Sequence, residues 1–328
     1  MTLGKPLPDN LLTSCLRGAG QVFFQPNAAT GLFFLAAIAW ASHDNGNWSI
    51  FAGAVVGLVV ATLTAHLIGC DAPSIHQGLY GFNGILVGVA LPTFLSVNPT
   101  MWAYLVIGAA VSSVVVDALS TVVTRNWGIA GSTAPFVLVT WLLLLGAYAF
   151  AHLHIAGMGP PALATELAVG ADTLSLRELP TILFLNIGEV FLLGSAISGV
   201  LIVIGLAVSS VPAAIAALLG SAVAIGCSIV LGVDTGAMRE GLYGFSPVLT
   251  AIAVGVVFLK TSPKVVFFAF LATVFTVIVQ GAMDTLMSPW GIPTLTAPYV
   301  LTMWLFTLPK KDINPHPHRT TKGGRLGG

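Results

Sequence analysis

Glu189 is the residue of this sequence whose placement most suggests chemistry, because it lies within an apolar stretch. An ionisable group in such a place is costly to keep, so it is a functional candidate by default. Its carboxylate can accept hydrogen bonds or carry a charge, although a position at the edge of the stretch would also account for it. Asp117 and Asp284 lie in apolar stretches too, and we interpret both as helix-packing or interface residues.

No arrangement typical of an enzyme accompanies these acids. The sequence contains no HExxH, no GxSxG and no paired catalytic aspartate motif. His66 has no second histidine at metal-binding spacing, and the three cysteines are too far apart for a CxxC pair. We therefore expect no catalytic residue, no metal site and no cofactor, and the remaining chemistry is hydrogen bonding.

The composition indicates a membrane protein. The chain has 328 residues, 56% of them hydrophobic, with a mean hydropathy of +0.95 and only 12 basic and 12 acidic residues. A soluble domain of this length would carry about 80 charges. Soluble enzymes are excluded, and nucleic-acid binding is excluded because no basic stripe with aromatic residues is present. The first residues lack an apolar region followed by a small-residue cleavage site, so we expect no removable signal peptide.

A membrane-spanning helix needs about 20 mostly apolar residues. Breaks at proline, glycine and charged clusters divide the sequence into ten predicted spans. They are 27–43, 48–69, 78–95, 100–123, 134–152, 186–208, 211–232, 241–259, 263–284 and 297–309.

The two sets of five spans are copies of one another, which is the most informative feature of the sequence. GLYGF at 78–82 recurs identically at 241–245, an offset of 163 residues. At the same offset, 127–142 and 290–305 are identical at 10 of 16 positions, and near the start 20–23 aligns with 188–191. We therefore predict four parts. These are a first membrane repeat (1–152), a linker (153–185), a second membrane repeat (186–309) and a flexible polar C-terminal tail (310–328).

The basic residues predict the orientation of the two repeats. With a cytoplasmic N-terminus and five spans per repeat, ten lysines and arginines fall on the cytoplasmic side and two fall outside. Because five is an odd number, the repeats must have opposite orientations in the membrane. The cytoplasmic residues are Lys5, Arg17, Arg125, Lys260, Lys264, Lys310, Lys311, Arg319, Lys322 and Arg325, and the outer ones are Arg177 and Arg239.

The segments in which the repeat is strongest are unsuited to a continuous helix. Each begins with Trp-Gly-Ile and reaches Thr-Ala-Pro, at Thr133 and Thr296, before a new apolar run starts. Proline disfavours helix at the preceding residue and suits a first helical turn. We predict a re-entrant or half-length segment in each repeat, where broken backbone must line protein or water. Ordinary turns between helices are the alternative.

The paired segments GSTAPFVLVTW and TLTAPYVLTMW, together with the duplicated GLYGF, resemble the urea transporter family. The resemblance covers nearly the whole chain and implies an all-α polytopic membrane protein with two inverted repeats, each of about five transmembrane helices plus a re-entrant half-helix. It also implies a channel that passes urea down its gradient, surrounded by membrane lipid, in a homotrimer with one pore per subunit. The implied location is a bacterial inner membrane, with both termini cytoplasmic.

The resemblance assigns pore roles to particular residues. Phe82 and Phe245 would form a flat slot for a planar solute, with Leu86 and Leu249 one helical turn further on. Thr133 and Thr296 would form a central constriction, and Gln21 and Glu189 would offer oxygens towards opposite mouths. The complete predicted set is Gln21, Phe24, Phe82, Leu86, Thr133, Glu189, Val190, Phe245, Leu249 and Thr296. Phe24 aligns with Leu192, so a symmetric slot at that level is not expected.

Other functions stay open for the same sequence. A channel for water, ammonia or short amides would use the same fold, and an ion-coupled transporter would use Glu189 with Asp117. The pore roles of individual residues also have alternatives. Phenylalanines in spans often face lipid or the protein core instead of a pore, and threonine hydroxyls often bond to the backbone of their own helix.

Overall fold

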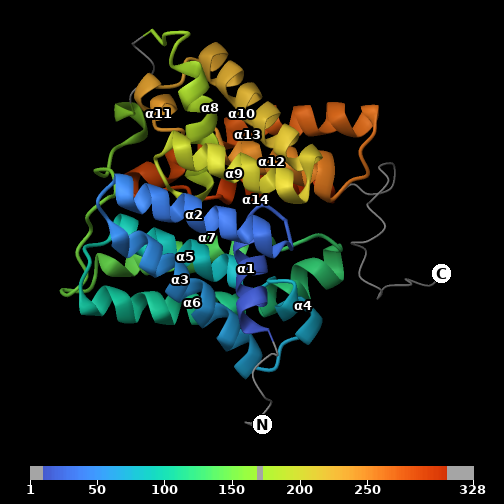
Figure 1. The fold of residues 1–328 in the computed structure, drawn as a ribbon. Helices are drawn as coiled ribbons and strands as arrows, with labels where there is room; N and C mark the ends of the chain where they lie inside the picture. The colour runs from blue at the N-terminus through green and yellow to red at the C-terminus, as the bar shows by residue number, and fades with distance from the viewer. Residues whose placement is uncertain (1–9, 168–172, 309–328) are drawn as a thin grey trace.

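The computed structural model describes residues 10–167 and 173–308, most of which lie in helices (Figure 1). The predicted tail, 310–328, lies outside the described residues. We call α1 to α7 the first half. Its helices are α1 (Leu11–Gln21), α2 (Ala28–Asp44), α3 (Trp48–Leu67), α4 (Ala72–His76), α5 (Gly81–Phe94), α6 (Pro99–Leu119), the π-helical η1 (Ser120–Trp127) and α7 (Ala134–Ala147).

The second half, α8 to α14, has the same order of long and short helices after a short turn, η2 (Ala164–Glu166). Its helices are α8 (Leu179–Gly188), η3 (Glu189–Phe191), α9 (Ala196–Ser209), α10 (Val211–Leu231), α11 (Thr235–Arg239), α12 (Phe245–Ile252), η4 (Ala253–Val257), α13 (Pro263–Met287), η5 (Ser288–Trp290) and α14 (Ala297–Thr307).

Among the described residues, four helices are long and apolar enough to cross a membrane. They are α3, α10, α6 continued by η1, and α13 continued by η5. A polytopic helical membrane protein is thereby confirmed. By contrast, α7 and α14 have 14 and 11 residues, too few to cross a hydrocarbon core of about 30 Å at 1.5 Å per residue.

The predicted span 186–208 is wrong as a single helix. The chain bends by 75° between Leu179–Phe191 and Ala196–Ser209. The cause is local, because Leu192 adopts a left-handed conformation with φ of 57°, which no helix can continue. The first half breaks in the same way at Phe24, with φ of 64°. The prediction that the first span begins at residue 27 therefore missed α1, the short helix before this break.

The helix starts repeat together with the sequence. Asp71 and Asp234 cap α4 and α11, with carboxylates that accept the backbone N–H of Ser74 and Ala237. Three further pairs of N-caps occupy corresponding places in the two halves: Asn27 and Ser195, Asn47 and Ser210, and Asn98 and Ser262. A side-chain oxygen at each position satisfies N–H groups that the first helical turn leaves open.

The GLYGF elements are the turns that follow α4 and α11, together with the first residues of α5 and α12. Gly78 and Gly241 have φ of 81° and 79°, and each ends its short helix in a Schellman arrangement. A Cβ on Gly78 would collide with the backbone of Gly18 in α1. Glycine is therefore required twice over, for its positive φ and for close contact with α1.

Glycines also bring α3 and α5 into backbone contact. A Cβ on Gly84 of α5 would overlap the Cβ of Ala61 and the carbonyl of Gly57, both in α3. Small residues are the usual means of close helix packing where the surroundings are as apolar as the helices. In the second half, Gly220 of α10 approaches Pro247 and Ala251 of α12 in the same way.

The region of the predicted linker that the structure describes is attached to both halves. Its first residues pair with the end of α5, since Ser96 N–H donates to His154 O at 2.8 Å and Ala156 N–H donates to Phe94 O at 3.0 Å. Near its end, Glu178 accepts a hydrogen bond from Arg239 at 2.8 Å. The Arg239 guanidinium holds the pKa of the Glu178 carboxyl below its ordinary value. Arg239, one of the two basic residues predicted to lie on the outer side, is thus paired with Glu178.

We expect Gly84→Ala to destabilise the protein by about 1–3 kcal/mol, because α3 and α5 must separate to accommodate the methyl group. Gly226→Ala in α10 is the matched control, since a Cβ there meets nothing within 4 Å. Thermal unfolding of the detergent-solubilised protein measures both. Equal melting temperatures for the two variants would contradict tight α3–α5 packing.

Candidate functional site

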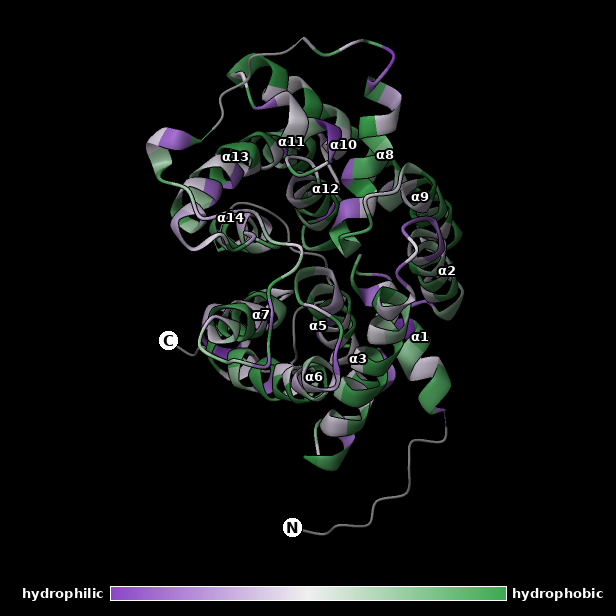
Figure 2. Cartoon of the chain, turned by 90° about the vertical axis from the view of Figure 1, so that its left-hand side faces the viewer, coloured by the Kyte–Doolittle hydropathy of each residue, from purple (hydrophilic) through white to green (hydrophobic). Residues whose placement is uncertain are grey.

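All ten predicted site residues are buried, with exposed fractions of 9% or less. The apolar members belong to one continuous core cluster: Phe24, Phe82, Leu86, Val190, Phe245 and Leu249. Figure 2 shows the boundary between the halves, with α5 and α7 on one side and α12 and α14 on the other.

Thr133 and Thr296 meet across this boundary. Their hydroxyl oxygens lie 2.7 Å apart in a buried hydrogen bond, and either can be the donor. Each is the residue before the first turn of its helix, α7 or α14. The residue before each threonine, Ser132 or Leu295, has a φ of 51° in the left-handed region. Non-glycine residues in that region mark places where the surrounding structure holds the backbone under constraint.

A second pair of repeat-equivalent residues meets on the same boundary. The rings of Phe23 and Phe191 have centroids 6.0 Å apart, and both contact Phe34. Phe23 and Phe191 correspond at the offset of 168 residues that relates the beginnings of the two halves. Each lies in the break that follows its first short helix, α1 or α8.

Hydrogen bonds across the boundary are exchanged reciprocally. Trp141 Nε1 donates to Pro293 O and Trp304 Nε1 donates to Ala130 O, both at 2.9 Å. At the 163-residue offset, Trp141 corresponds to Trp304 and Ala130 corresponds to Pro293. Each half therefore satisfies a carbonyl in the broken segment of the other.

The same exchange joins α2 and α9, which lie side by side (Figure 1). Thr30 Oγ1 donates to Gly205 O, and Ser198 Oγ donates to Ala37 O, both at 2.8 Å. Such reciprocity is typical of two units related by a two-fold rotation, in which only residues on the axis touch their own equivalents. The Thr133–Thr296 and Phe23–Phe191 pairs have that property.

The residues of the predicted slot lie at helix starts. Phe245 is the first residue of α12, Phe82 is the second residue of α5, and Leu249 and Leu86 follow each by one turn. The close contact of the GLYGF turns with α1 and α8 fixes where these helices start.

Gln21 and Glu189 occupy equivalent environments beside these turns. Gln21 Nε2 donates to the carbonyl of Gln77 at 2.9 Å, immediately before Gly78. Glu189 lies against Gly241, and its carboxylate accepts the N–H of Gly194 at 2.5 Å. Each side chain retains at least one oxygen lone pair for a further donor.

Phe24 and Val190 lie at the breaks themselves. The ring of Phe24 makes edge contacts with Phe258 and Tyr299, at centroid distances of 5.8 and 6.0 Å. Its repeat partner Leu192 has the same left-handed backbone but no ring. The backbone is therefore symmetric at this level while the side chains differ, as the alignment predicts.

Comparison with known proteins decides the family. A family model described as "Urea transporter" matches residues 12–311. The chain belongs to the urea transporter family. It is a transporter and not an enzyme.

Curated relatives agree with this membership. Urea transporter 1 of Ovis aries is 27% identical over 311 residues, which cover 93% of this chain and 78% of the relative. Urea transporter 1 of Rattus norvegicus is 27% identical over 322 residues, covering 96% and 81%.

The sequence did not point to several residues of this urea transporter that adjoin the predicted site. Tyr299 shares a 2.6 Å hydrogen bond with Ser132, one residue from Thr133. Asn83 accepts the N–H of Phe136 at 2.9 Å and so ties α5 to the first turn of α7. The sequence repeat could have identified Tyr299, because this residue lies in the repeated TAP segment. Asn83 follows GLYGF but is not itself repeated, so the sequence contains no indication of its role.

The second half makes the corresponding connection with other residues. Ser246 replaces Asn83, and its hydroxyl has no hydrogen-bond partner. Asp284 of α13 instead bonds to Gln280 at 2.9 Å and to the hydroxyls of Tyr243 and Thr294. Its carboxylate thus joins the GLYGF turn to the segment before Thr296, which supports a packing role for this acid.

Two cavities of this urea transporter lie elsewhere. One is an open groove on α13, and the other is a small space of about 150 Å³ near Asn186 and Tyr243. Neither is lined by any of the ten predicted residues.

We expect Asn83→Ala to destabilise the protein by about 1–3 kcal/mol, because the buried Phe136 N–H then loses its acceptor. Ser246→Ala, the repeat-equivalent change, removes a hydroxyl without a partner and should alter stability by much less. Thermal unfolding in detergent compares the two variants. A larger loss for Ser246→Ala would refute the assignment of Asn83 as the connection between α5 and α7.

Proposed function

We propose that this protein is a passive urea channel whose pore passes between the two halves, with the Thr133–Thr296 pair at its centre. The observation that carries the proposal is the contact of each threonine with its own repeat equivalent. A path that crosses a two-fold axis has its midpoint there, and residues on the axis line that midpoint. Eight of the ten predicted residues form four repeat-equivalent pairs, which would then be arranged symmetrically along the path, whereas Phe24 and Val190 have no equivalent in the set.

The threonine pair has the hydrogen-bonding capacity that a dehydrated urea molecule requires. Losing its hydrogen bonds to water without replacement would cost urea several kcal/mol. Of the two hydroxyls, one donates to the other, so the pair keeps one O–H donor and free lone pairs. The donor suits the urea carbonyl and the lone pairs suit its N–H groups. The rings of Phe82 and Phe245 would admit a flat solute and exclude a hydrated ion.

The proposal includes an inverted arrangement of the two halves in the membrane. It is supported by the reciprocal contacts between the halves and by the ten-to-two distribution of basic residues across the predicted sides. In this arrangement α7 and α14 are half-length segments that begin near the bilayer middle. In the segment before each of these helices, one backbone carbonyl, Ala130 O or Pro293 O, accepts a hydrogen bond from a tryptophan of the opposite half.

The resemblance to the family extends the proposal to assembly and location. We place the protein in a bacterial inner membrane as a homotrimer with one pore per subunit and both termini in the cytoplasm. The domain limits predicted from the sequence, 1–152 and 186–309 around a linker, are part of the same proposal.

Flux into proteoliposomes tests the central claim. We expect urea to enter far faster than glycerol and at a rate that imposed proton or sodium gradients do not change. A rate that follows an imposed gradient would indicate an ion-coupled transporter, with Glu189 as the first candidate for the coupling site. If water or ammonia passes through the protein but urea does not, the channel serves a different neutral solute.

We expect the double variant Thr133→Val and Thr296→Val to slow urea flux roughly five- to 150-fold. Valine keeps the side-chain volume but removes the hydroxyls, and a lost hydrogen bond costs about 1–3 kcal/mol at the barrier. Stopped-flow light scattering of proteoliposomes measures the rate.

Thr140→Val is the control for this change, because Thr140 lies in α7 and its buried hydroxyl has no hydrogen-bond partner. It should leave urea flux unchanged. Normal flux in a correctly inserted double variant would show that the paired hydroxyls do not meet the solute.

The inverted arrangement predicts that residues 125 and 239 lie on opposite sides of the membrane. Single cysteines replace Arg125 and Arg239 in a background from which Cys15, Cys70 and Cys227 have been removed. An impermeant thiol reagent applied to intact cells should then label position 239 only. Labelling of both positions from one side would contradict the arrangement.

A further inference from the structure

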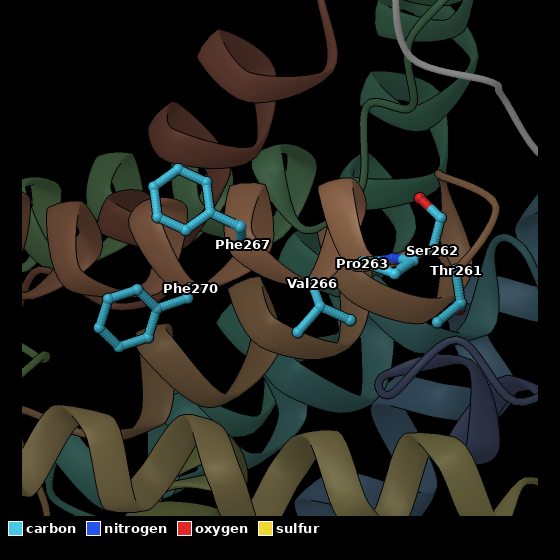
Figure 3. Close-up of a pocket in the computed structure, with 6 residues that line it drawn as sticks. All are labelled: Thr261, Ser262, Pro263, Val266, Phe267 and Phe270. Carbon is cyan, nitrogen blue, oxygen red and sulfur yellow. The ribbon is translucent and has the colours of Figure 1, made fainter.

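The open groove on α13 is unsuited to a polar solute. Its wall includes Val266, Phe267 and Phe270 (Figure 3), each of which is more than half exposed. Apolar side chains of this kind cannot replace the hydrogen bonds that urea makes with water. Hydroxyl groups that can replace them lie at the boundary between the halves, next to the threonine pair.

Ser132, the residue before Thr133, is held by two helices. Asn83 Nδ2 of α5 donates to the carbonyl of Ser132 at 3.4 Å, and the hydroxyl oxygen of Tyr299 in α14 lies 2.6 Å from Ser132 Oγ. Between these contacts Ser132 has a φ of 51°, in the left-handed region. A strained backbone persists only where its surroundings determine it, so the position of this serine is well defined.

The two hydroxyls of this pair differ in access. Tyr299 is completely buried, whereas Ser132 is partly exposed. A phenol is more acidic than an aliphatic alcohol and is therefore the better donor of the two. When Tyr299 donates, Ser132 keeps its own O–H for a further acceptor. The serine thus presents an accessible donor whose oxygen is held in place by the tyrosine.

The second half has no such group at the equivalent place. At the 163-residue offset, Ser132 corresponds to Leu295 and Tyr299 corresponds to Phe136, and both of these equivalents are buried in the apolar core. Leu295 nevertheless has the same φ of 51°. The turn before each threonine therefore forms with an apolar pair as well as with a polar one, and the hydroxyls of Ser132 and Tyr299 are not needed to make it.

A further difference between the halves adjoins this pair. The ring of Tyr299 makes an edge contact with Phe24 at a centroid distance of 6.0 Å, and the repeat partner of Phe24 is Leu192. The unmatched hydroxyls and the unmatched ring are thus in contact. Because a two-fold rotation places repeat equivalents on opposite sides of the axis, this group lies on one side of the threonine pair only.

We propose that Ser132 is a further solute-binding residue, which donates its O–H to the carbonyl oxygen of urea beside the threonine pair, and that Tyr299 is its positioning residue. The inference rests on the proposed urea channel. It adds to the path one hydrogen-bonding site that has no symmetric counterpart, so the two directions of approach to the central threonines differ chemically.

Flux of urea and of thiourea into proteoliposomes tests the role of Ser132. Ser132→Ala should slow urea about fivefold, the effect of one lost hydrogen bond at the barrier. It should slow thiourea much less, because a sulfur atom accepts hydrogen bonds weakly. The urea-to-thiourea ratio should therefore fall, and this ratio does not depend on how much protein is inserted.

Tyr148→Phe is the matched control. It also removes a phenol hydroxyl that bonds across the boundary, to Trp290 O at 2.8 Å, but it lies outside the predicted site. Both fluxes should stay at the wild-type rate in this variant.

A double-variant comparison tests the role of Tyr299. Tyr299→Phe keeps the ring and removes the hydroxyl, and it should slow urea by less than Ser132→Ala does. Combining the two changes should slow urea no further than Ser132→Ala alone, because the tyrosine acts through the serine.

Two results would overturn the proposal. One is an unchanged urea-to-thiourea ratio in Ser132→Ala, and the other is an additive effect of the two changes, since either result makes the pair a structural connection only. If the wild-type protein passes no urea, the channel and this inference fail together. If Thr133→Val with Thr296→Val slows urea and Ser132→Ala does not, the channel stands and this inference alone fails.

Discussion

The constraint on which the rest of this structure depends is that broken backbone inside a membrane must find its hydrogen bonds within the protein. The segments before α7 and α14 interrupt the helical ladder and leave carbonyls without intrahelical donors. Trp141 and Trp304 satisfy Pro293 and Ala130 across the boundary, each from the opposite half. Neither half can therefore complete its own interior, and the two must associate to bury these segments.

This mutual dependence also brings Thr133 and Thr296 together. Their hydroxyls would be costly to bury singly, and the pairing satisfies one with the other. Because the helix starts at Phe82 and Phe245 are fixed by glycine contacts with neighbouring backbone, the proposed pore is bordered by rigid elements. A rigid border suits a selective channel, since a slot that changes width would not discriminate between a flat solute and a bulkier one.

The two halves make several of their internal contacts with different residues. Asn83 connects α5 to α7, whereas in the second half Asp284 connects the equivalent turn to the segment before α14. Gln21 and Glu189 likewise differ in side-chain type while lying beside equivalent turns. In each case the hydrogen-bond partners of the side chain differ between the halves as well.

The sequence by itself determined the class of the protein, its duplication and its family. These follow from composition, from the spacing of GLYGF and from the paired TAP segments, none of which needs coordinates. It missed α1 and the bend at Leu192, because a left-handed residue other than glycine has no signature in an apolar run. The tertiary structure alone decided that Thr133 meets Thr296, that Phe23 meets Phe191, and that tryptophans exchange bonds across the boundary. Those contacts join residues more than 150 positions apart, and only the packing of the two halves fixes which of them touch.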